Sequence, residues 1–502
     1  MKDFQVNTMS EKVGQKITEE KFARRLGLTG ATNLGLGALL GGGIYVISGI
    51  AAGMVGPGII IAYLFTGLLT IFTAINYAEL SSSIPKQGGG YTFANDTFGG
   101  FPAFLTGWFL LVGNIVACGL YSLAVAHTLA LFIPIATPEM VTTIAVVIIA
   151  FTLVTNILSV KSVSGVLGVF NIAQSVVLFS FIGLGLFFVQ PTNLDPFFAP
   201  GTGFMELMAT FSFIYISFIG YELITTASEE IKEPAKNIPR AILLTLLIAT
   251  AIYVTAAFVM VGVVPYSELA NLKSPIPIAY VYGSMLGGGA FYFGLAGMAA
   301  SNYAALNATF LSTARVTYAL GRDRFLPGFL DRVSPRFKTP IPALLVGFIA
   351  VSAFALTGRV ELVASLAGLA YLVGQAVVNS SVIVVRIRRL DVPGTFKARF
   401  YPAFPILGVA MCLLFIVNQS VEALQMGFWL ALIGLVIYIG YGRRRSRERL
   451  QESRADRVAS TVFVIELNLK SDDSIGHYTP ITETKMPMIE KQKDSGGDEQ
   501  ED

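Results

Sequence analysis

Charged side chains are scarce in this chain, and their scarcity decides its class. Only 13% of the 502 residues are Asp, Glu, Lys or Arg, whereas 54% are hydrophobic. Soluble domains carry about 25% charged residues. The composition therefore excludes an ordinary soluble fold and predicts an all-α protein that crosses a lipid bilayer many times. The net charge of +3 says little, because such a protein sorts its charges by membrane side.

Histidine and cysteine are also rare, which argues against an enzyme. The chain has two of each, and both cysteines, Cys118 and Cys412, fall in apolar segments, so a disulfide framework is excluded. No Cys/His cluster has the spacing of a metal site, and no P-loop is present to couple ATP hydrolysis. We expect no catalysis, no metal, no bound cofactor and no nucleic-acid partner.

Apolar segments of roughly 20 residues, the length of a membrane-crossing helix, recur along the chain. The N-terminus lacks the pattern of a cleaved signal peptide, so we expect the first span to serve as the insertion signal. We predict about twelve spans, at 27–55, 58–83, 101–133, 139–160, 164–190, 203–228, 240–264, 286–318, 340–357, 361–385, 403–419 and 422–441.

Lysine and arginine alternate between the loops that join these spans. They gather before the first span, in every second loop and after the last span, whereas the opposite loops hold little beyond Lys273 and Arg359. The positive-inside rule then predicts a multi-pass protein of the cell membrane with both termini in the cytoplasm. We divide the chain into a cytoplasmic N-terminal segment at 1–26, a ten-helix core at 27–400, two additional helices at 401–441 and a charged, largely disordered cytoplasmic tail at 442–502. Within that tail, 461–469 alternates like a strand.

Glycine interrupts the first span. Gly41, Gly42 and Gly43 lie in the middle of the apolar run, and a glycine in a helix interior costs roughly 1 kcal/mol relative to alanine. An unwound backbone inside a bilayer is tolerated only where it is buried in protein or lines a cavity. The run therefore predicts a broken helix whose free N–H and C=O groups bind a ligand. Close packing of helices on small residues is the alternative.

The sixth span repeats this feature. Its segment 211–222 carries Ser217, Gly220 and Glu222 inside an otherwise apolar run. An acid within a membrane span is costly and indicates a functional site. Two interrupted spans five helices apart are typical of a transporter built from inverted repeats, here spans one to five and six to ten.

Four blocks of sequence resemble the amino acid–polyamine–organocation superfamily. They read GALLGGGIYV in the first span, NYAELSSSIPKQGGGYTF after the second, SFIGYELITTASEEIKEPAKNIPRAI in the sixth and LSTARVTYALGRDRFLP after the eighth. The resemblance covers residues 27–340 best and does not extend to the tail. It implies a LeuT-type 5+5 inverted-repeat fold and the transport of L-amino acids or amines such as polyamines by alternating access.

Another class of function remains open. A membrane sensor or receptor would use the same pocket and signal through the tail. A channel is disfavoured, because we find no filter sequence. The sequence identifies neither the amino acid nor the direction of net transport nor the oligomeric state.

A zwitterionic substrate needs one site for its carboxylate and one for its ammonium group. Glycine N–H groups at 41–43 suit the carboxylate, because no side chain blocks approach and the helix dipole favours an anion. Here Gly42 replaces the small serine usual in the superfamily, which removes a hydroxyl donor. We expect the ammonium group at freed carbonyls, and a gate or pocket wall at neighbouring side chains. The candidate substrate-binding residues are Leu39, Leu40, Gly41, Gly42, Gly43, Asn114, Ile216, Ser217, Phe218 and Ile219.

The coupling ion is less well determined. Glu222 either carries a proton, because a buried carboxyl can cycle between charge states, or is a structural acid. Proton-coupled relatives carry a lysine in the fifth span, where this chain has Gln174, and a neutral amide delivers no titrating charge. Two other possibilities remain. A sodium ion could bind among carbonyls and the hydroxyls of Ser312 or Thr313, or the protein could exchange substrates without any coupling ion. Glu79 and Arg315, at helix ends, are the candidates for an inner gate, and surface charge is their alternative explanation.

Overall fold

The computed structural model describes residues 26–84, 88–133, 135, 137–158, 160–272, 275–337, 339–388, 396–446 and 448, and the side chains of all of these except 160–167 and 229. The predicted N-terminal segment, apart from Leu26, lies outside the described residues. So do nearly all of the tail and its strand-like segment at 461–469. The helices named below all belong to the compact unit that ends at Arg447.

Helices make up all the named elements in the described part of the chain, and the expected all-α class is confirmed. In chain order they are α2 (Leu28–Leu39), η1 (Gly43–Ile47), α3 (Ser48–Val55), η2 (Gly56–Gly58), α4 (Ile59–Ser83), α5 (Gly89–Thr97), α6 (Gly100–Ala130), α7 (Pro138–Leu158), α8 (Val160–Gly185), η3 (Pro191–Leu194), α9 (Phe204–Ile214), η4 (Tyr215–Phe218), α10 (Leu223–Thr226), η5 (Ser228–Glu230), α11 (Pro234–Val263), α12 (Tyr266–Ala270), α13 (Pro277–Leu286), α14 (Gly288–Arg322), η6 (Gly328–Asp331), α15 (Ile341–Ala355), α16 (Val360–Ile387), α17 (Ala403–Val417), α18 (Val421–Ile437) and η7 (Tyr438–Gly442).

The predicted spans coincide with these helices. Among the described residues, 8 helical stretches are long and apolar enough to cross a membrane, and the first of them, Leu28–Ser83, contains two predicted spans. Two shorter apolar helices, Ile341–Ala355 and Ala403–Val417, match the ninth and eleventh predicted spans. α14 matches the eighth, although its asparagines and serines make it more polar.

Glycine and proline set many of the helix boundaries. Gly56, whose φ of 65° suits a residue without a side chain, ends α3, and Pro57 then begins the turn into α4. Pro234, Pro277 and Pro342 lie in the first turns of α11, α13 and α15, where a missing N–H costs no hydrogen bond.

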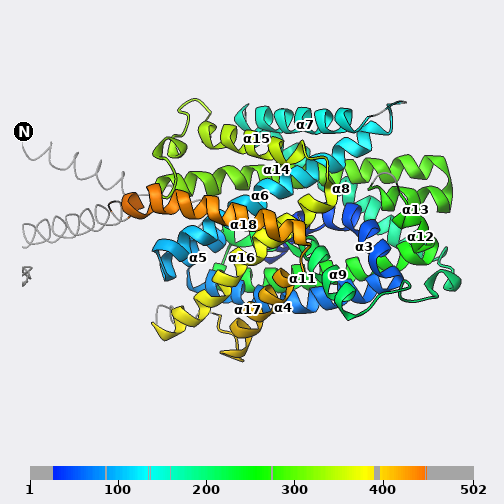
Figure 1. Ribbon diagram of the computed structural model, residues 1–502, viewed down its shortest axis with the longest axis horizontal. Coiled ribbons are helices and arrows are strands. Elements are labelled where there is room, and N and C mark those ends of the chain that lie inside the picture. The colour runs from blue at the N-terminus through cyan, green and yellow to red at the C-terminus, as the bar shows by residue number, and fades with distance from the viewer. Residues whose placement is uncertain are drawn as a thin grey trace, which may run out of the picture. The chain divides into compact units, whose positions relative to one another are not determined.

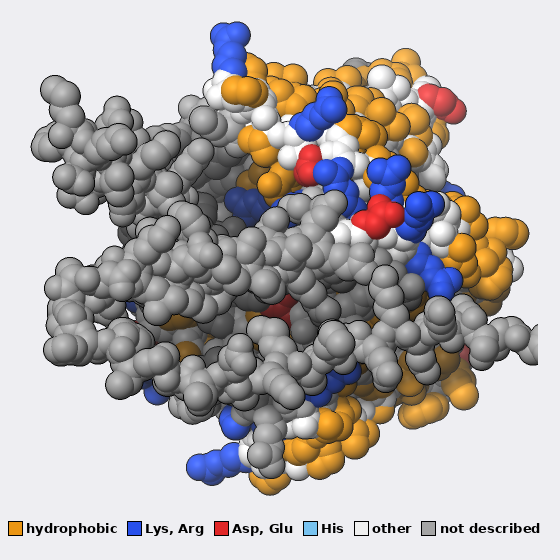
Figure 2. Space-filling model, turned by 90° about the vertical axis from the view of Figure 1, so that its left-hand side faces the viewer, with side chains coloured by type: hydrophobic (Ala, Val, Ile, Leu, Met, Phe, Trp, Pro, Cys, Tyr) orange, Lys and Arg blue, Asp and Glu red, His pale blue; other side chains and the backbone are white. Residues whose placement is uncertain are grey.

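The long helices run side by side along one direction. In Figure 1, α7 and α15 lie at one edge of the bundle and α4 and α17 at the other. The most apolar 18-residue stretch of α6 is 100% buried, whereas the corresponding stretch of the last span, Val421–Ser446, is 17% buried. α6 therefore lies at the centre of the bundle and the last span at its periphery. Figure 2 shows Lys and Arg side chains gathered on one end of this bundle, among apolar side chains.

Tyrosine is prominent in the core. Most of the largest fully buried side chains are tyrosines, and several of them lie on the helices around the two interrupted spans: Tyr45, Tyr63, Tyr77, Tyr215, Tyr221 and Tyr253. A buried tyrosine hydroxyl normally needs a hydrogen-bond partner. The interrupted spans supply carbonyl partners to Tyr63 and Tyr253, whereas the hydroxyls of Tyr77 and Tyr221 have no partner among the described residues.

Candidate functional site

Both predicted helix interruptions are present. α2 ends at Leu39, and the chain resumes helical turns only in η1, after Leu40 and Gly41. In the sixth span, α9 passes into η4, and residues 219–222 separate η4 from α10. Gly220 has a φ of 136°, a conformation that L side chains rarely adopt, so glycine permits this second interruption.

The two interruptions touch each other. A Cβ atom added at Gly43 would lie 2.5 Å from the Cα of Ser217 and 2.6 Å from its Oγ. One added at Gly220 would lie 3.0 Å from the carbonyl carbon of Ala38. Glycine therefore lets η1 cross η4 at a distance that no other residue allows, and lets the loop at Gly220 approach the end of α2 closely.

Tyr253 of α11 joins the two unwound segments. Its hydroxyl lies 2.5 Å from the carbonyl oxygen of Leu39 and 2.8 Å from that of Ser217. Its ring packs against Tyr63 and Phe218, with centroids 5.4 and 5.2 Å away. Nothing in the local sequence around Tyr253 distinguishes it from a packing tyrosine.

The carbonyls predicted for the ammonium group already have protein partners. Leu39 and Ser217 accept from Tyr253, Leu40 accepts from the Ser301 hydroxyl at 3.1 Å, and the Ile216 carbonyl accepts from the Ile219 N–H at 3.2 Å. The Leu39 carbonyl also accepts from the Gly41 N–H at 2.6 Å, so both of its lone pairs and that predicted N–H are occupied. A carbonyl oxygen has two lone pairs, so those of Leu40, Ile216 and Ser217 can accept a second hydrogen bond from a ligand.

Two buried polar atoms beside the glycine pair lack any partner among the described residues. They are the Oγ of Ser217 and the Oδ1 of Asn302, on residues that are 2% and 0% exposed. A Cβ atom at Gly42 would lie 2.6 Å from that Asn302 oxygen and 2.8 Å from the Tyr121 ring. Buried polar atoms are nearly always hydrogen-bonded, so these two acceptors are suited to a polar ligand.

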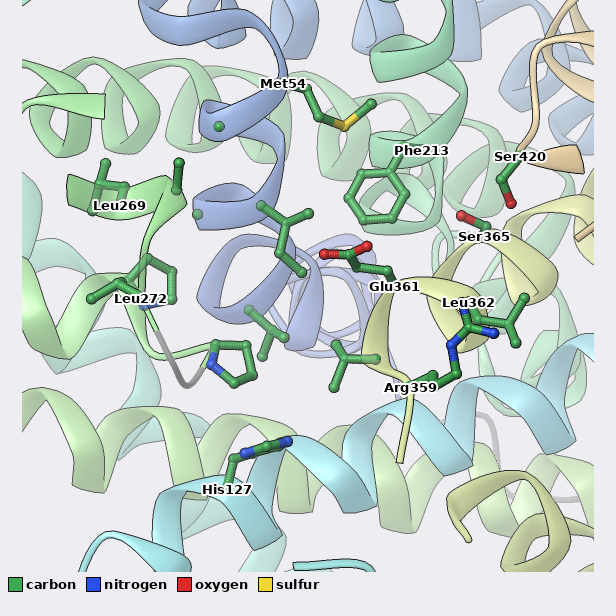
Figure 3. A pocket seen from close by; sticks show the side chains of 18 of the residues that line it. Met54, His127, Phe213, Leu269, Leu272, Arg359, Glu361, Leu362, Ser365 and Ser420 are labelled. Atoms are coloured by element: carbon green, nitrogen blue, oxygen red, sulfur yellow. The ribbon is translucent and has the colours of Figure 1, made fainter. Parts of the chain in front are cut away.

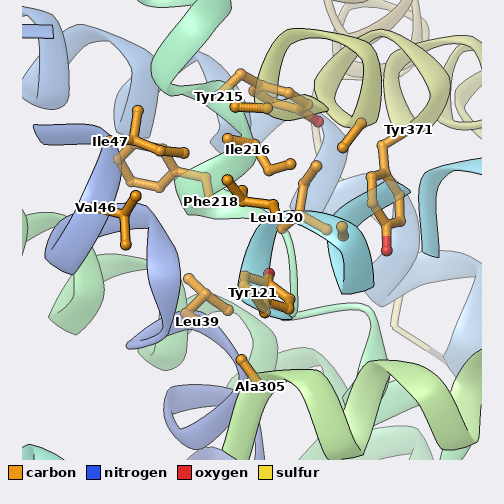
Figure 4. Packing of buried hydrophobic residues seen from close by; sticks show 14 of the residues in the cluster. Leu39, Val46, Ile47, Leu120, Tyr121, Tyr215, Ile216, Phe218, Ala305 and Tyr371 are labelled. Atoms are coloured by element: carbon orange, nitrogen blue, oxygen red, sulfur yellow. The ribbon is translucent and has the colours of Figure 1, made fainter. Parts of the chain in front are cut away.

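Apolar side chains surround the crossing. Figure 4 shows Ile216 and Phe218 of η4 beside Val46 and Ile47 of η1. Ile216 is 3% exposed and Phe218 is fully buried. The wall offers van der Waals contact and no charge.

Glu222 lies next to a small cavity, about 20 Å³ in volume, which is room for one water molecule. The Glu222 carboxylate accepts from the N–H of Gly220 at 2.8 Å. Asn114 and Tyr371 line the same cavity, and the Tyr371 hydroxyl donates to the Asn114 Oδ1 at 2.5 Å. The structure thus brings Asn114, Ile219 and Glu222 together.

Gln174 lies on the other side of the first interruption. The hydroxyl of Tyr45, in η1, donates to the Gln174 carbonyl at 2.6 Å. The Gln174 Nε2 donates to Asn171 at 3.0 Å, while its Oε1 has no hydrogen-bond partner among the described atoms. Gln174 is 1% exposed and borders a cavity of about 780 Å³ that also reaches Leu40.

Ser312 and Thr313 do not reach the first interruption through any hydrogen bond of the described residues. Ser312 accepts from Asn114 at 3.3 Å, and the Thr313 hydroxyl donates to the carbonyl of Thr309 at 2.9 Å. The hydroxyl that α14 directs at the unwound backbone belongs to Ser301. The polar run Ser301–Asn302 in an apolar helix is the signal that sequence reasoning missed.

Glu79 forms an ion pair with Arg386, and Arg315 is an exposed residue elsewhere on α14. Two Arg386 nitrogens lie 2.6 and 2.7 Å from the Glu79 oxygens, and the carboxylate is 3% exposed. The Ala398 N–H donates to Glu79 at 2.9 Å, and the Ala398 carbonyl accepts from Arg386 at 3.0 Å. The pair therefore ties α4, α16 and the segment before α17 together.

A large cavity of about 760 Å³ opens where α16 begins, and we call it the α16 cavity. Its residues come from the first interrupted span, from α6, α9, the region of α12 and α13, and the N-terminal ends of α16 and α18 (Figure 3). They include Val46, Ile50, Met54, His127, Phe213, Pro277, Arg359, Glu361, Leu362 and Glu422. Because Val46 belongs to η1, this cavity reaches the element that follows the first interruption.

The sequence matches known transport proteins over most of its length. Residues 26–440 match the model of a family described as amino acid permease. A branched-chain amino acid permease of Bacillus subtilis is 29% identical over 472 residues, which cover 88% of this chain and 98% of that protein. A methylthioribose transporter of Bacillus subtilis is 30% identical over 458 residues, covering 87% and 97%. The human large neutral amino acids transporter small subunit 2 is 27% identical over 437 residues, covering 83% and 80%.

Proposed function

The chain belongs to the amino acid permease family, and from this premise we propose that it is a secondary active transporter of L-amino acids that works by alternating access. Membership makes it a multi-pass membrane protein and a transporter rather than an enzyme. The proposal adds the site, the class of amino acid and the mode of transport.

The observation that carries the proposal is the pair of unpartnered acceptors beside Gly42 and Gly43. An ammonium group bound by the Ser217 Oγ and the Asn302 Oδ1 would satisfy both atoms. The N–H groups at the start of η1 would then hold the carboxylate, where the positive end of the helix dipole favours it.

We propose a neutral, aliphatic side chain for the substrate. Two apolar side chains, Ile216 and Phe218, border the crossing. Neither can form an ion pair or a hydrogen bond with a polar or charged substrate side chain. The names of two relatives, a branched-chain amino acid permease and a large neutral amino acids transporter, agree with this choice. Leucine, isoleucine and valine are therefore the first substrates to test, and methylthioribose is a useful contrast.

Alternating access is supported by the volumes around the site. The small cavity beside Glu222 holds about 20 Å³, whereas the α16 cavity holds about 760 Å³. Ligand pockets usually measure about 300–1,000 Å³, and both the α16 cavity and the cavity beside Gln174 have that size. We propose entry from the α16 cavity, because Val46 of η1 lines it. We propose that this side faces the outside of the cell and that both termini are cytoplasmic.

The test is uptake of labelled leucine into proteoliposomes that contain the purified protein. Accumulation, or exchange against unlabelled leucine inside, is the expected result. Binding of leucine without either process would favour a sensor and contradict the proposal. Uptake of methylthioribose or a polyamine, with no uptake of any amino acid, would contradict the proposed substrate class.

A further inference from the structure

The α16 cavity contains one carboxylate that no other described residue engages. Glu361 lies in the first turn of α16, and Figure 3 shows its carboxylate reaching into the middle of the cavity. The other acid at this cavity, Glu422, lies 2.6 Å from the guanidinium group of Arg359. Glu361 makes no hydrogen bond or ion pair with any other described residue.

Glu361 is exposed to the cavity, where apolar and polar side chains both lie around it. Val46, Ile50, Phe213 and Leu362 line the cavity together with the carboxylate. His127 contributes an imidazole from α6, on the opposite wall in Figure 3. Arg359 and Glu422 neutralise each other. When His127 is neutral, the cavity therefore carries one net negative charge beside a lining that is apolar in part.

From this arrangement we propose that the α16 cavity is a second binding site, in which Glu361 holds the ammonium group of an incoming amino acid while its aliphatic side chain contacts the apolar lining. The inference rests on the proposed function for the identity of the natural ligand. Its chemistry is more general, because any primary alkylamine with an aliphatic chain presents the same two features.

A helix N-terminus also favours an acid for structural reasons alone, because the helix dipole stabilises it. The experiment must therefore separate recognition from stability. 3-Methylbutylamine, which is leucine without its carboxyl group, is a suitable probe, because it cannot use a carboxylate site at Gly41–Gly43. Its binding to the full-length protein is measured by calorimetry, which requires no transport.

We expect saturable binding of 3-methylbutylamine to the wild-type protein and loss of that binding in Glu361→Gln. In leucine uptake, Glu361→Gln should raise KM roughly threefold to fivefold with kcat unchanged, the size expected for a partly exposed charge pair. The difference from the wild type should shrink at high ionic strength, because salt screens exposed charges. A purely structural role would lower Tm and show no such salt dependence.

Glu139→Gln is the matched control. Glu139 is an exposed first-turn acid of α7, and it does not line the α16 cavity. This variant should bind the amine like the wild type. Amine binding that survives Glu361→Gln, or that is lost in Glu222→Gln instead, would overturn the proposal. Amine binding through Glu361 without any leucine uptake would support this site and contradict the proposed function only.

Discussion

Gly43 is the residue at which lack of a side chain has the clearest consequence. Its backbone is helical, as is that of Gly42 with a φ of −56°, so space rather than backbone strain requires glycine at both positions. Gly43→Ala would place a methyl group 2.5 Å from the Cα of Ser217. We expect this variant, and Gly42→Leu, to lose leucine binding while still inserting into the membrane, measured by calorimetry on monodisperse protein.

Gly183→Ala is the control for this prediction, because an added Cβ at Gly183 meets no atom within 4 Å. It lies in α8 and should bind leucine normally, with a small gain in stability from better helix propensity. Unchanged leucine affinity in Gly43→Ala would contradict the assignment of the site to the helix crossing.

Tyr253 gives a second prediction at this scale. Tyr253→Phe removes the hydroxyl that contacts the Leu39 and Ser217 carbonyls. The Leu39 carbonyl keeps the Gly41 N–H as a partner, and a buried acceptor left unsatisfied, as at Ser217, costs about 1–3 kcal/mol. We expect a lower Tm and a loss of leucine uptake. Tyr282→Phe is the matched control, because the Tyr282 hydroxyl bonds the Val177 carbonyl at 2.7 Å. It should lower Tm similarly and leave the KM for leucine unchanged; equal effects of both variants on KM would argue against a special role for Tyr253.

At the scale of elements, the Glu79–Arg386 pair connects α4 with α16. Removing one partner of a buried ion pair leaves an uncompensated charge and typically costs about 3–5 kcal/mol. Arg386 is 18% exposed, so we expect Glu79→Gln to reach the lower part of that range. The double variant Glu79→Gln/Arg386→Gln should recover part of the lost Tm, as measured by thermal unfolding.

Lys236→Gln serves as the control for this pair. Lys236 and Glu233 are 57% and 70% exposed, and exposed pairs contribute about 0–1 kcal/mol. Its Tm should match that of the wild type. A double variant less stable than Glu79→Gln alone would show that Arg386 stabilises the fold without its partner.

The interruptions themselves were predictable from sequence, because three glycines in one span and Gly220 in another weaken a helix locally. Their partners were not. Tyr253 and Asn302 act from α11 and α14, and their roles arise from contacts across hundreds of residues. The predicted sodium site at Ser312 stays a prediction; the α14 hydroxyl that bonds the unwound backbone is that of Ser301, eleven residues earlier and, at about 1.5 Å per residue, roughly 16 Å away. The ion pair of Glu79 with Arg386 likewise depends on tertiary structure, because the sequence offers several arginines as partners and does not show which one lies nearby.

For the whole molecule, the open question is the energy source of transport. Gln174 offers no titrating charge next to the first interruption, so we expect leucine uptake to be indifferent to an imposed pH gradient, and counterflow to persist without ion gradients if the protein is an exchanger. Uptake that requires sodium would instead indicate a symporter. Measurements in proteoliposomes with controlled inner and outer buffers decide between them.

Glu222→Gln completes this test. The variant fixes the carboxyl in a neutral form and should bind leucine. Wild-type uptake driven by an inward proton gradient, and insensitive to that gradient in Glu222→Gln, would contradict the expectation and identify Glu222 as the proton carrier. The overall fold does not depend on this outcome, because the predicted spans, the two interruptions and the family all agree with the LeuT-type architecture.

The contact between Gly43 and Ser217 also has a consequence in genetic terms. An added methyl group at position 43 would lie 2.5 Å from both the Cα and the Cβ of Ser217, and every amino acid possesses the Cα. Replacing Ser217 with glycine removes its Cβ and Oγ and leaves that Cα in place. No substitution at position 217 can therefore suppress Gly43→Ala, and second-site revertants should arise only where they shift a whole helix.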